Sequence, residues 1–517
     1  MNRSRLVDLL AWAGPCVLLG VALWFHARVD TEPPAWDEAV HLRDAWVFHR
    51  LITHPGEWDL SRLSAIAKGS DEWPLLRPSG FYPPLVPGVQ ALAFVLLGPS
   101  ERLAVLTNLV FLALLAFSVQ GLGRAFAGPA AGRVAGAAVL LFPIVARHSV
   151  LSMLELPLTA LVAASLLALV RAEGFRAAGA SLFLGALLGC GLLAKWTFVA
   201  FLAGPLAVAA GGALFRPEAR RLRNLAACVG VALLVAGPYY TVALPAMIEK
   251  VPGFARYARE PGHRDLWSAA SALHYFRLLG PELLGITGLI AATLGAIRLA
   301  RGRLNLFALA GVVVPWAILT FAIQNKQARF LMPWIVWAGV AAGALASLPR
   351  IGRFLGVATL VLLGVGAVGT HLEVHGELRS RLGEDWKLDH AVVAIERDWG
   401  GRPGAPPRVA VIPNHPFWNG QTLQFQAARL GFAANFVKLT PLFQQDPARF
   451  RADRERFAYV ILKGRERAAE RGLEQPVDVL EAIFLEDRDA YDLLVRLPLP
   501  DASIAHVFRR RPLPALR

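Results

Sequence analysis

Cysteine and charged residues are scarce in this sequence. Only 3 of the 517 residues are cysteine, and Cys16, Cys190 and Cys228 all lie in apolar runs. They indicate neither a disulfide framework nor a zinc site, and ordinary buried thiols are the simpler interpretation. Charged residues make up 18% of the chain and hydrophobic residues 55%, a composition too apolar for an ordinary soluble enzyme. We expect an integral membrane protein.

The positive net charge does not indicate a nucleic-acid partner. A nucleic-acid surface should concentrate Lys and Arg on one soluble element. Here the formal net charge is +15, but much of the excess lies in short gaps between apolar runs, which is a pattern of membrane topology. We therefore expect no nucleic acid to bind.

Apolar runs of membrane-spanning length recur along the first 370 residues. Most are close to the ~20 residues that a bilayer helix needs. They predict about eleven spans, near 6–26, 102–122, 131–149, 156–172, 176–195, 196–215, 223–245, 276–299, 304–322, 330–348 and 354–370. A further apolar stretch at 82–98 begins with Pro83, Pro84 and Pro87, so its unbroken part is short. We expect that stretch to lie in the membrane interface.

The basic residues are distributed as this topology requires. With eleven spans and a cytoplasmic N-terminus, every cytoplasmic gap is basic, as the positive-inside rule demands. These gaps contain Arg3 and Arg5, Arg124 and Arg133, Arg171 and Arg176, and the segments 216–223, 298–303 and 349–353. The first run shows no evident cleavage site, so we interpret it as an uncleaved anchor. Abundant Ala, Leu, Gly and Arg are typical of GC-rich bacteria, and we expect a multi-pass protein of a bacterial inner membrane.

Two large segments then lie on the outer, periplasmic side. One is the loop at 30–101, which belongs to a transmembrane domain over 1–370 and should contain interfacial helices. The other is the segment 371–517. It contains strand-like stretches at 408–412, 457–463 and 491–497, separated by charged stretches that could form helices. We expect an all-α polytopic membrane domain followed by a small soluble α/β domain whose role no motif reveals.

Two adjacent carboxylates follow the first apolar run. Pro33 and Pro34 are suited to the entrance of a helix, and Asp37 and Glu38 would stand in its first turn. Neighbours on a helix point about 100° apart, so the two carboxylates need different partners. A simpler interpretation is that both acids only complement the helix dipole, which is worth roughly 0.3–1 kcal/mol.

Other polar residues gather at the same predicted membrane face. Glu155 stands where the third span meets the fourth, Lys195 where the fifth meets the sixth, and the segment 324–330 joins the ninth and tenth. Charges at a membrane boundary are costly unless they are solvated or paired, so such residues usually line a cavity. The alternative is that Lys195 and Arg329 merely extend their charged ends to the interface.

A set of short motifs occurs in order on this one face. They are the DE pair at 37–38, YPPL at 82–85, an acidic residue before Pro157, AKWT at 194–197 and KQARFLMP at 326–333. The set resembles the polyprenyl-phosphate-sugar-dependent glycosyltransferases of the protein O-mannosyltransferase and lipid A aminoarabinose transferase type, glycosyltransferase family 39. The resemblance covers roughly residues 1–370 and implies the GT-C fold.

The resemblance implies an activity and the residues that carry it. Such enzymes move a sugar from a polyprenyl phosphate at the outer leaflet to an acceptor hydroxyl on a protein, a lipid or a glycan, usually with inversion. It implies Asp37 as general base with Glu38 in support. It also implies that Lys195, Lys326 and Arg329 bind the donor phosphate.

The remaining candidate site residues can be interpreted in more than one way. Glu155 stands where the family more often has Asp, and we include it without a defined role. Tyr82 either contacts the sugar or anchors the loop at the interface. Asp37 and His41 are spaced like two metal ligands on one helix, but no third ligand is evident. We therefore expect no tightly bound metal, although metal use varies among these enzymes, and we assign His41 to the polar lining.

A transporter or flippase of polyprenyl lipids is the main alternative function. Transporters tend to place polar residues and broken helices near the membrane midplane and often show inverted repeats. In this sequence the polar residues collect at one membrane face, which suits surface catalysis better. The sequence does not identify the sugar, the acceptor or the prenyl chain length.

Overall fold

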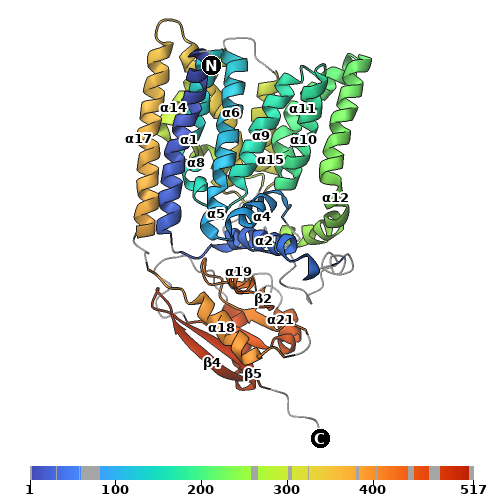
Figure 1. Ribbon diagram of the computed structural model, residues 1–517, viewed down its shortest axis with the longest axis vertical. Coiled ribbons are helices and arrows are strands. Elements are labelled where there is room, and N and C mark those ends of the chain that lie inside the picture. The colour runs from blue at the N-terminus through green and yellow to red at the C-terminus, as the bar shows by residue number, and fades with distance from the viewer. Residues whose placement is uncertain are drawn as a thin grey trace.

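The computed structural model shows a long helical bundle above a small sheet-containing domain (Figure 1). It describes residues 3–30, 32–57, 59, 82–257, 266–300, 306–323, 325–379, 383–402, 405–439, 447–464 and 478–511. Residues 60–81 of the predicted outer loop lie outside the described residues. The N-terminus and the sheet-containing domain lie at opposite ends of the bundle (Figure 1).

Each predicted span coincides with a helix or with consecutive helical segments. The bundle comprises α1 (Arg3–Val29), α6 (Asn108–Ala127), α7 (Pro129–Leu140), α8 (Pro143–Ser149), α9 (Glu155–Arg171), α10 (Ala178–Ala194), α11 (Phe198–Phe215), α12 (Ala219–Tyr257), α13 (Ala269–Leu278), the π-helical turn Leu279–Leu284, α14 (Gly285–Ala300), α15 (Leu306–Phe321), the 3-10 helix η3 (Ala328–Trp334), α16 (Ile335–Ala344) and α17 (Gly352–Arg379).

The lengths of the helices can be compared with the predicted total of eleven membrane spans. Among the described residues, six helices are long and apolar enough to cross a membrane, or seven if α7 and α8, bent by 54°, count as one. Three apolar helices are shorter than this: α10, α15 and the part Ala13–Val29 of α1. Helix α9 has 17 residues. The protein is therefore a helical membrane protein, and the total of eleven spans stays a prediction.

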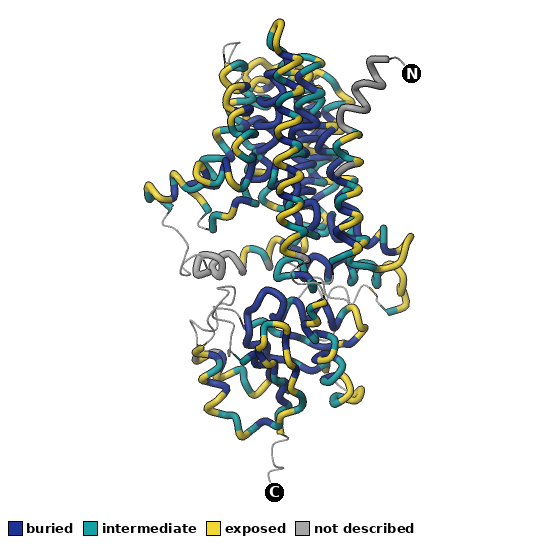
Figure 2. Tube along the Cα trace, turned by 90° about the vertical axis from the view of Figure 1, so that its left-hand side faces the viewer, coloured by how far each residue is buried: buried dark blue, intermediate teal, exposed yellow. Residues whose placement is uncertain are grey.

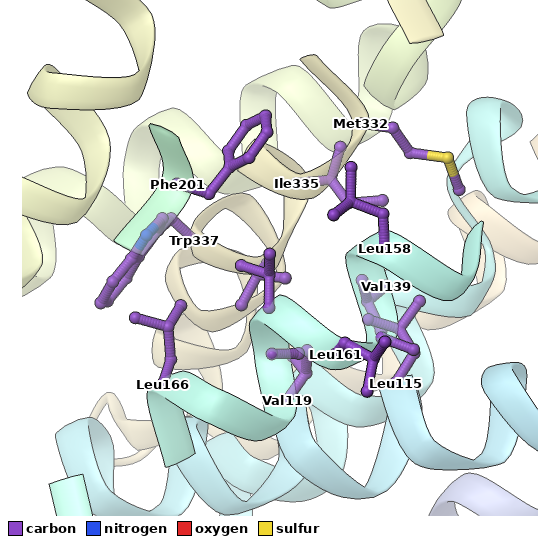
Figure 3. Close-up of a cluster of buried hydrophobic side chains, with 14 of the residues drawn as sticks. Leu115, Val119, Val139, Leu158, Leu161, Leu166, Phe201, Met332, Ile335 and Trp337 are labelled. Carbon is purple, nitrogen blue, oxygen red and sulfur yellow. The ribbon is translucent and has the colours of Figure 1, made fainter. Parts of the chain in front are cut away.

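The centre of the bundle is built from α6, α7, α9 and α16. Figure 3 shows Leu115, Val119, Val139 and Leu161 interdigitating there, all of them buried. Small residues let the helix backbones approach closely: a Cβ atom on Gly343 would lie 2.4 Å from the backbone oxygen of Ala131. The outer faces are exposed and apolar (Figure 2), as lipid contact requires.

Shorter helices lie across the end of the bundle that faces the sheet-containing domain (Figure 1). They are α2 (Trp36–Thr53), α4 (Leu85–Leu97) and α5 (Glu101–Leu106). The stretch that begins with three prolines thus forms α4 at the bundle end. Its Leu96 and Leu97 side chains are exposed, which suits a helix in the membrane interface.

The C-terminal domain is the predicted α/β unit. Its sheet contains β1 (Arg408–Val411), β2 (Asn435–Lys438), β3 (Tyr459–Lys463), β4 (Tyr491–Pro498) and β5 (Ile504–Arg510), in the order β2-β1-β3-β5-β4. Strand β1 runs parallel to both β2 and β3. Strand β5 runs antiparallel to β3 and to β4. The helices are α18 (Leu388–Trp399), α19 (Gly420–Leu430), α21 (Pro447–Asp453) and α22 (Asp478–Glu486). Of these, α19 packs on α2.

Two strands were missed by the sequence-based interpretation. β2 has only four residues, and β5 ends in two arginines, so neither shows a clear apolar alternation. Their neighbours in the sheet stabilise them: β2 pairs along its whole length with the more apolar β1, and residues 505–509 of β5 pair with the more apolar β3.

Candidate active site

The start of α2 is held from both sides. Trp36, its first residue, has a left-handed backbone with φ of 33°, which is uncommon for a bulky residue. Its N–H donates to the backbone oxygen of Pro416 at 3.4 Å, and α2 packs against both α4 and α19. The membrane domain and the C-terminal domain therefore position Asp37 together.

Four predicted residues from distant parts of the chain meet in one line of charges. An Arg329 nitrogen lies 3.0 Å from Asp37 Oδ2, and the Nε of Arg329 lies 3.8 Å from Glu155 Oε1. Lys195 Nζ donates to the same Glu155 oxygen at 2.8 Å. The order is Asp37, Arg329, Glu155 and Lys195, with the two signs alternating.

Glu155 is the buried centre of this line. Its side chain is only 2% exposed, against 12% for Lys195 and 21% for Arg329. The second carboxylate oxygen, Oε2, is buried and has no hydrogen-bond partner among the described residues. A buried carboxylate is tolerable only when cations compensate it, so Glu155 holds the two cations in place.

Asp37 is the most accessible member of the line. Its side chain is 32% exposed, more than that of any of its three partners. Of the two carboxylates in the line, only Asp37 can therefore meet an incoming hydroxyl group without first leaving a buried position.

Tyr82 and His41 lie beside Asp37. Their rings meet edge to face with centroids 4.5 Å apart, and the Tyr82 hydroxyl donates a hydrogen bond to Asp37. Burial and the nearby Asp37 carboxylate raise the pKa of Tyr82 well above its usual value. Burial lowers the pKa of His41 to about 4, so this imidazole is neutral at physiological pH.

Glu38 points away from Asp37, as the helix geometry predicts. Its Oε1 accepts a hydrogen bond from the backbone N–H of Ser152 at 2.6 Å. Burial raises the pKa of Glu38 to about 7, although the Ser152 N–H opposes this shift. Because Ser152 belongs to the loop between α8 and α9, Glu38 ties α2 to the segment that delivers Glu155.

Two amides that the sequence-based interpretation missed support the same loop. Asn108 Nδ2 donates to the backbone oxygens of Ser149 and Leu151, both at 2.9 Å. Gln90 Nε2 donates to Ser152 Oγ at 2.8 Å. Asn108 and Gln90 are buried polar residues in otherwise apolar runs. That pattern in the sequence could have identified them.

The structure places Lys326 elsewhere. Its Nζ donates to the backbone oxygens of Leu319, Thr320 and Ile323, at 3.2, 2.5 and 2.8 Å. These carbonyl groups lie at the C-terminal end of α15, where a cation is favourable. These three contacts place the Lys326 ammonium group at the end of α15.

Metal-ligating groups are sparse near the site. Within the described ranges, the one group of three side chains whose ligand atoms gather within 4.8 Å is Asp385, Asp389 and His390 in the C-terminal domain. Two of its members are exposed. His41 keeps a buried Nδ1 without a hydrogen-bond partner in the described part of the chain, so it could offer one ligand beside Asp37.

Known proteins resemble the chain both in sequence, through a family model, and in structure. Residues 82–242 match the family model described as dolichyl-phosphate-mannose-protein mannosyltransferase. Solved structures match nearly the whole chain. ArnT from Cupriavidus metallidurans bound to undecaprenyl phosphate has 14% identity and a TM-score of 0.57, covering 96% of this chain and 98% of that one. No curated protein sequence matches the chain.

An archaeal structure shows the same arrangement. The oligosaccharyltransferase AglB from Archaeoglobus fulgidus, in complex with an inhibitory peptide and a dolichol-phosphate, has 12% identity and a TM-score of 0.51, covering 98% of this chain and 75% of that one. This chain has the GT-C fold. The matches confirm the predicted resemblance and support glycosyltransferase activity.

Proposed function

We propose that this GT-C protein is an inverting glycosyltransferase that moves a sugar from a polyprenyl-phosphate donor to an acceptor hydroxyl. One observation carries the proposal: the accessible Asp37 carboxylate lies 3.0 Å from Arg329, beside a second cation that buried Glu155 holds. Transfer from a phosphate to a hydroxyl needs such a base next to positive charge. The undecaprenyl phosphate bound to ArnT and the dolichol-phosphate bound to AglB support a polyprenyl donor.

The charged residues of the site have different roles in the reaction. The leaving group is a phosphate, so cations stabilise it and no proton donor is needed. Arg329 can hold two phosphate oxygens at once, and Lys195 acts as a point charge. A phosphate that takes over the Arg329 guanidinium releases Asp37 from its ion pair.

Asp37 then takes the proton of the acceptor hydroxyl. As the hydroxyl oxygen forms its bond to the anomeric carbon, the bond from that carbon to the phosphate oxygen breaks. Attack from the face opposite the phosphate inverts the configuration. Tyr82, which donates a hydrogen bond to Asp37, orients the carboxylate for this transfer.

We also propose that the site works without a tightly bound metal. Lys195 and Arg329 supply the positive charge that a divalent cation would otherwise bring to the phosphate. Transfer should therefore survive treatment with EDTA, and strict dependence on an added divalent cation would contradict this assignment.

The site lies at the start of α2, at the end of the bundle that faces the C-terminal domain (Figure 1), and we propose that this side is periplasmic. The described basic gaps at 124–133, 171–176 and 216–223 belong to the other end of the bundle (Figure 1), where the positive-inside rule places the cytoplasm. The acceptor is then a peptide, lipid or glycan hydroxyl reached from outside the inner membrane. An AglB structure tethered to an acceptor peptide supports the peptide class.

A transfer assay tests the function. Purified full-length protein in lipid receives radiolabelled undecaprenyl-phosphate sugars one at a time, with a membrane extract as acceptor. Asp37→Asn should lower turnover by about 10²–10⁴-fold, because the base is lost, while the control Asp389→Asn, at a half-exposed carboxylate of the C-terminal domain, should not. Near-normal turnover of Asp37→Asn would refute the base assignment. If folded wild-type protein transfers no sugar, a transporter or flippase becomes the better explanation.

A further inference from the structure

Five arginines lie around the start of α12, at the end of the bundle opposite the C-terminal domain (Figure 1). This arginine cluster consists of Arg176, in the loop before α10, and of Arg216, Arg220, Arg221 and Arg223. The same two segments, 173–176 and 216–223, contain only two acidic residues, Glu173 and Glu218. The proposed transfer reaction uses none of these residues.

The loop before α10 is held against the first turns of α12. The buried Asn224 side chain donates from Nδ2 to the backbone oxygen of Phe175 at 2.8 Å. Beside it, a single carboxylate oxygen, Oε1 of Glu218, lies 2.8 Å from an Arg176 nitrogen and 3.1 Å from an Arg221 nitrogen. Two guanidinium groups therefore meet at one acid, which can neutralise only one of them.

Much of the positive charge of the cluster has no acidic partner. In the part of the chain that the structure describes, Arg216, Arg220 and Arg223 form no ion pair, and all three are exposed. The Arg221 side chain is only 11% exposed, and its buried Nε has no hydrogen-bond partner among the described residues. The cluster thus offers excess charge and a buried donor to an anion.

Exposed apolar side chains lie next to the cluster. Leu214 and Phe215 stand at the end of α11, and Phe215 is 90% exposed. Along α12, Leu222, Val229 and Leu233 are exposed and spaced i, i+7 and i+11, so they form an apolar stripe on one helix face. Because α12 lies at the edge of the bundle and packs mainly on α10 (Figure 1), this stripe is available to lipid tails.

We propose that the arginine cluster binds the headgroup of an anionic phospholipid, whose acyl chains pack along the apolar stripe of α12. Arginine can hold two phosphate oxygens at once, and clusters of roughly four to eight basic residues beside a membrane helix are typical of sites for anionic lipids. A small soluble anion would use the charge but not the stripe, whereas a phospholipid uses both. The proposal does not depend on the transfer reaction.

Lipid binding by the full-length protein tests the proposal. Delipidated protein in a neutral detergent is titrated with cardiolipin or with zwitterionic phosphatidylcholine, and native mass spectrometry measures each affinity. Wild type should bind cardiolipin at least about 10-fold more tightly than phosphatidylcholine. The double variant Arg220→Gln with Arg223→Gln should bind cardiolipin about 10-fold or more weakly than wild type, with phosphatidylcholine binding unchanged.

A second variant should change the affinity in the opposite direction. Glu218→Gln removes the acid that competes with the headgroup for Arg176 and Arg221, so it should tighten cardiolipin binding. Misfolding cannot produce such a gain. Unchanged or weaker cardiolipin binding by Glu218→Gln would contradict the proposal.

The gap before α17 supplies a matched control. Arg350→Gln with Arg353→Gln also removes two exposed arginines three positions apart and should leave cardiolipin binding unchanged. Equal losses in the two double variants would show that only the overall charge matters, and equal binding of both lipids to wild type would likewise overturn the proposal. Undecaprenyl phosphate should bind equally to wild type and to Arg220→Gln with Arg223→Gln; weaker binding by the variant would assign the cluster to that lipid instead.

Discussion

The pair formed by Glu155 and Lys195 should be strongly coupled energetically. The charges are 2.8 Å apart, and their side chains are only 2% and 12% exposed. Coulomb's law with an effective dielectric constant of 20 gives about 6 kcal/mol of attraction, which the desolvation of both ions largely offsets. Removing one partner leaves the other buried and uncompensated, so Glu155→Gln and Lys195→Met should each destabilise the protein by about 3 kcal/mol.

The double variant should be far less than additive. With both charges removed no uncompensated ion remains at that contact, so a double-mutant cycle should give a coupling energy of about 2–3 kcal/mol. This coupling energy should lie at the lower end of the range for buried pairs, because Arg329 lies 3.8 Å from Glu155 and still compensates its charge when Lys195 is removed. Reversible unfolding of the purified protein in mixed micelles measures each free energy.

The chain offers a matched control. Arg176 and Glu218 are also 2.8 Å apart, but their side chains are 54% and 47% exposed. The same cycle on Arg176→Met and Glu218→Gln should give a much smaller coupling, because solvent screens exposed pairs. Equal couplings for the two pairs, or additive effects at Glu155 and Lys195, would refute the argument that burial makes this pair essential.

Three further predictions concern single residues. The pKa of Glu38 is raised from 4.5 to about 7 in the folded protein, so its contribution to stability is complete below about pH 4.5 and is lost as the pH rises through 7; unfolding of Glu38→Gln should depend less on pH across that window, and an unchanged profile would contradict the burial of this carboxylate. Lys326→Met should lower the melting temperature by removing the charge at the end of α15, yet leave the apparent KM for the donor unchanged; a raised KM would return Lys326 to the phosphate site. Arg329→Lys should weaken donor binding about 10-fold or more in a titration with undecaprenyl phosphate, because two-point contact to phosphate is lost; unchanged affinity would mean that Arg329 only neutralises Asp37 and Glu155.

Much of the fold follows from local features of the sequence. Apolar runs of bilayer length predict helices at the places where the structure has them, and the proline-containing stretch at 82–98 forms the short helix α4 at the end of the bundle (Figure 1). The strands β1, β3 and β4 are apolar enough to be recognised. β2 and β5 are not, because their stability comes from pairing with β1 and β3.

The candidate site was predictable only in part. Asp37, Glu155, Lys195 and Arg329 could be selected because charges at a membrane face require solvation or partners. Lys326, which the resemblance implies as a ligand of the donor phosphate, contacts the carbonyl groups at the end of α15 in this structure, and its role toward the donor stays a prediction. A cation near a helix end can serve either purpose, and only the direction of its side chain distinguishes them.

The sequence by itself determined the membrane class, the places of the helices along the chain and the residue types available at one face, because these depend on composition and on contacts within a few residues. Tertiary structure decided which charges meet. Arg329 pairs with Asp37 across 292 positions, Glu38 supports the loop before α9, and Asn224 holds the loop before α10. Packing of the helices sets such long-range contacts, and no local pattern encodes them.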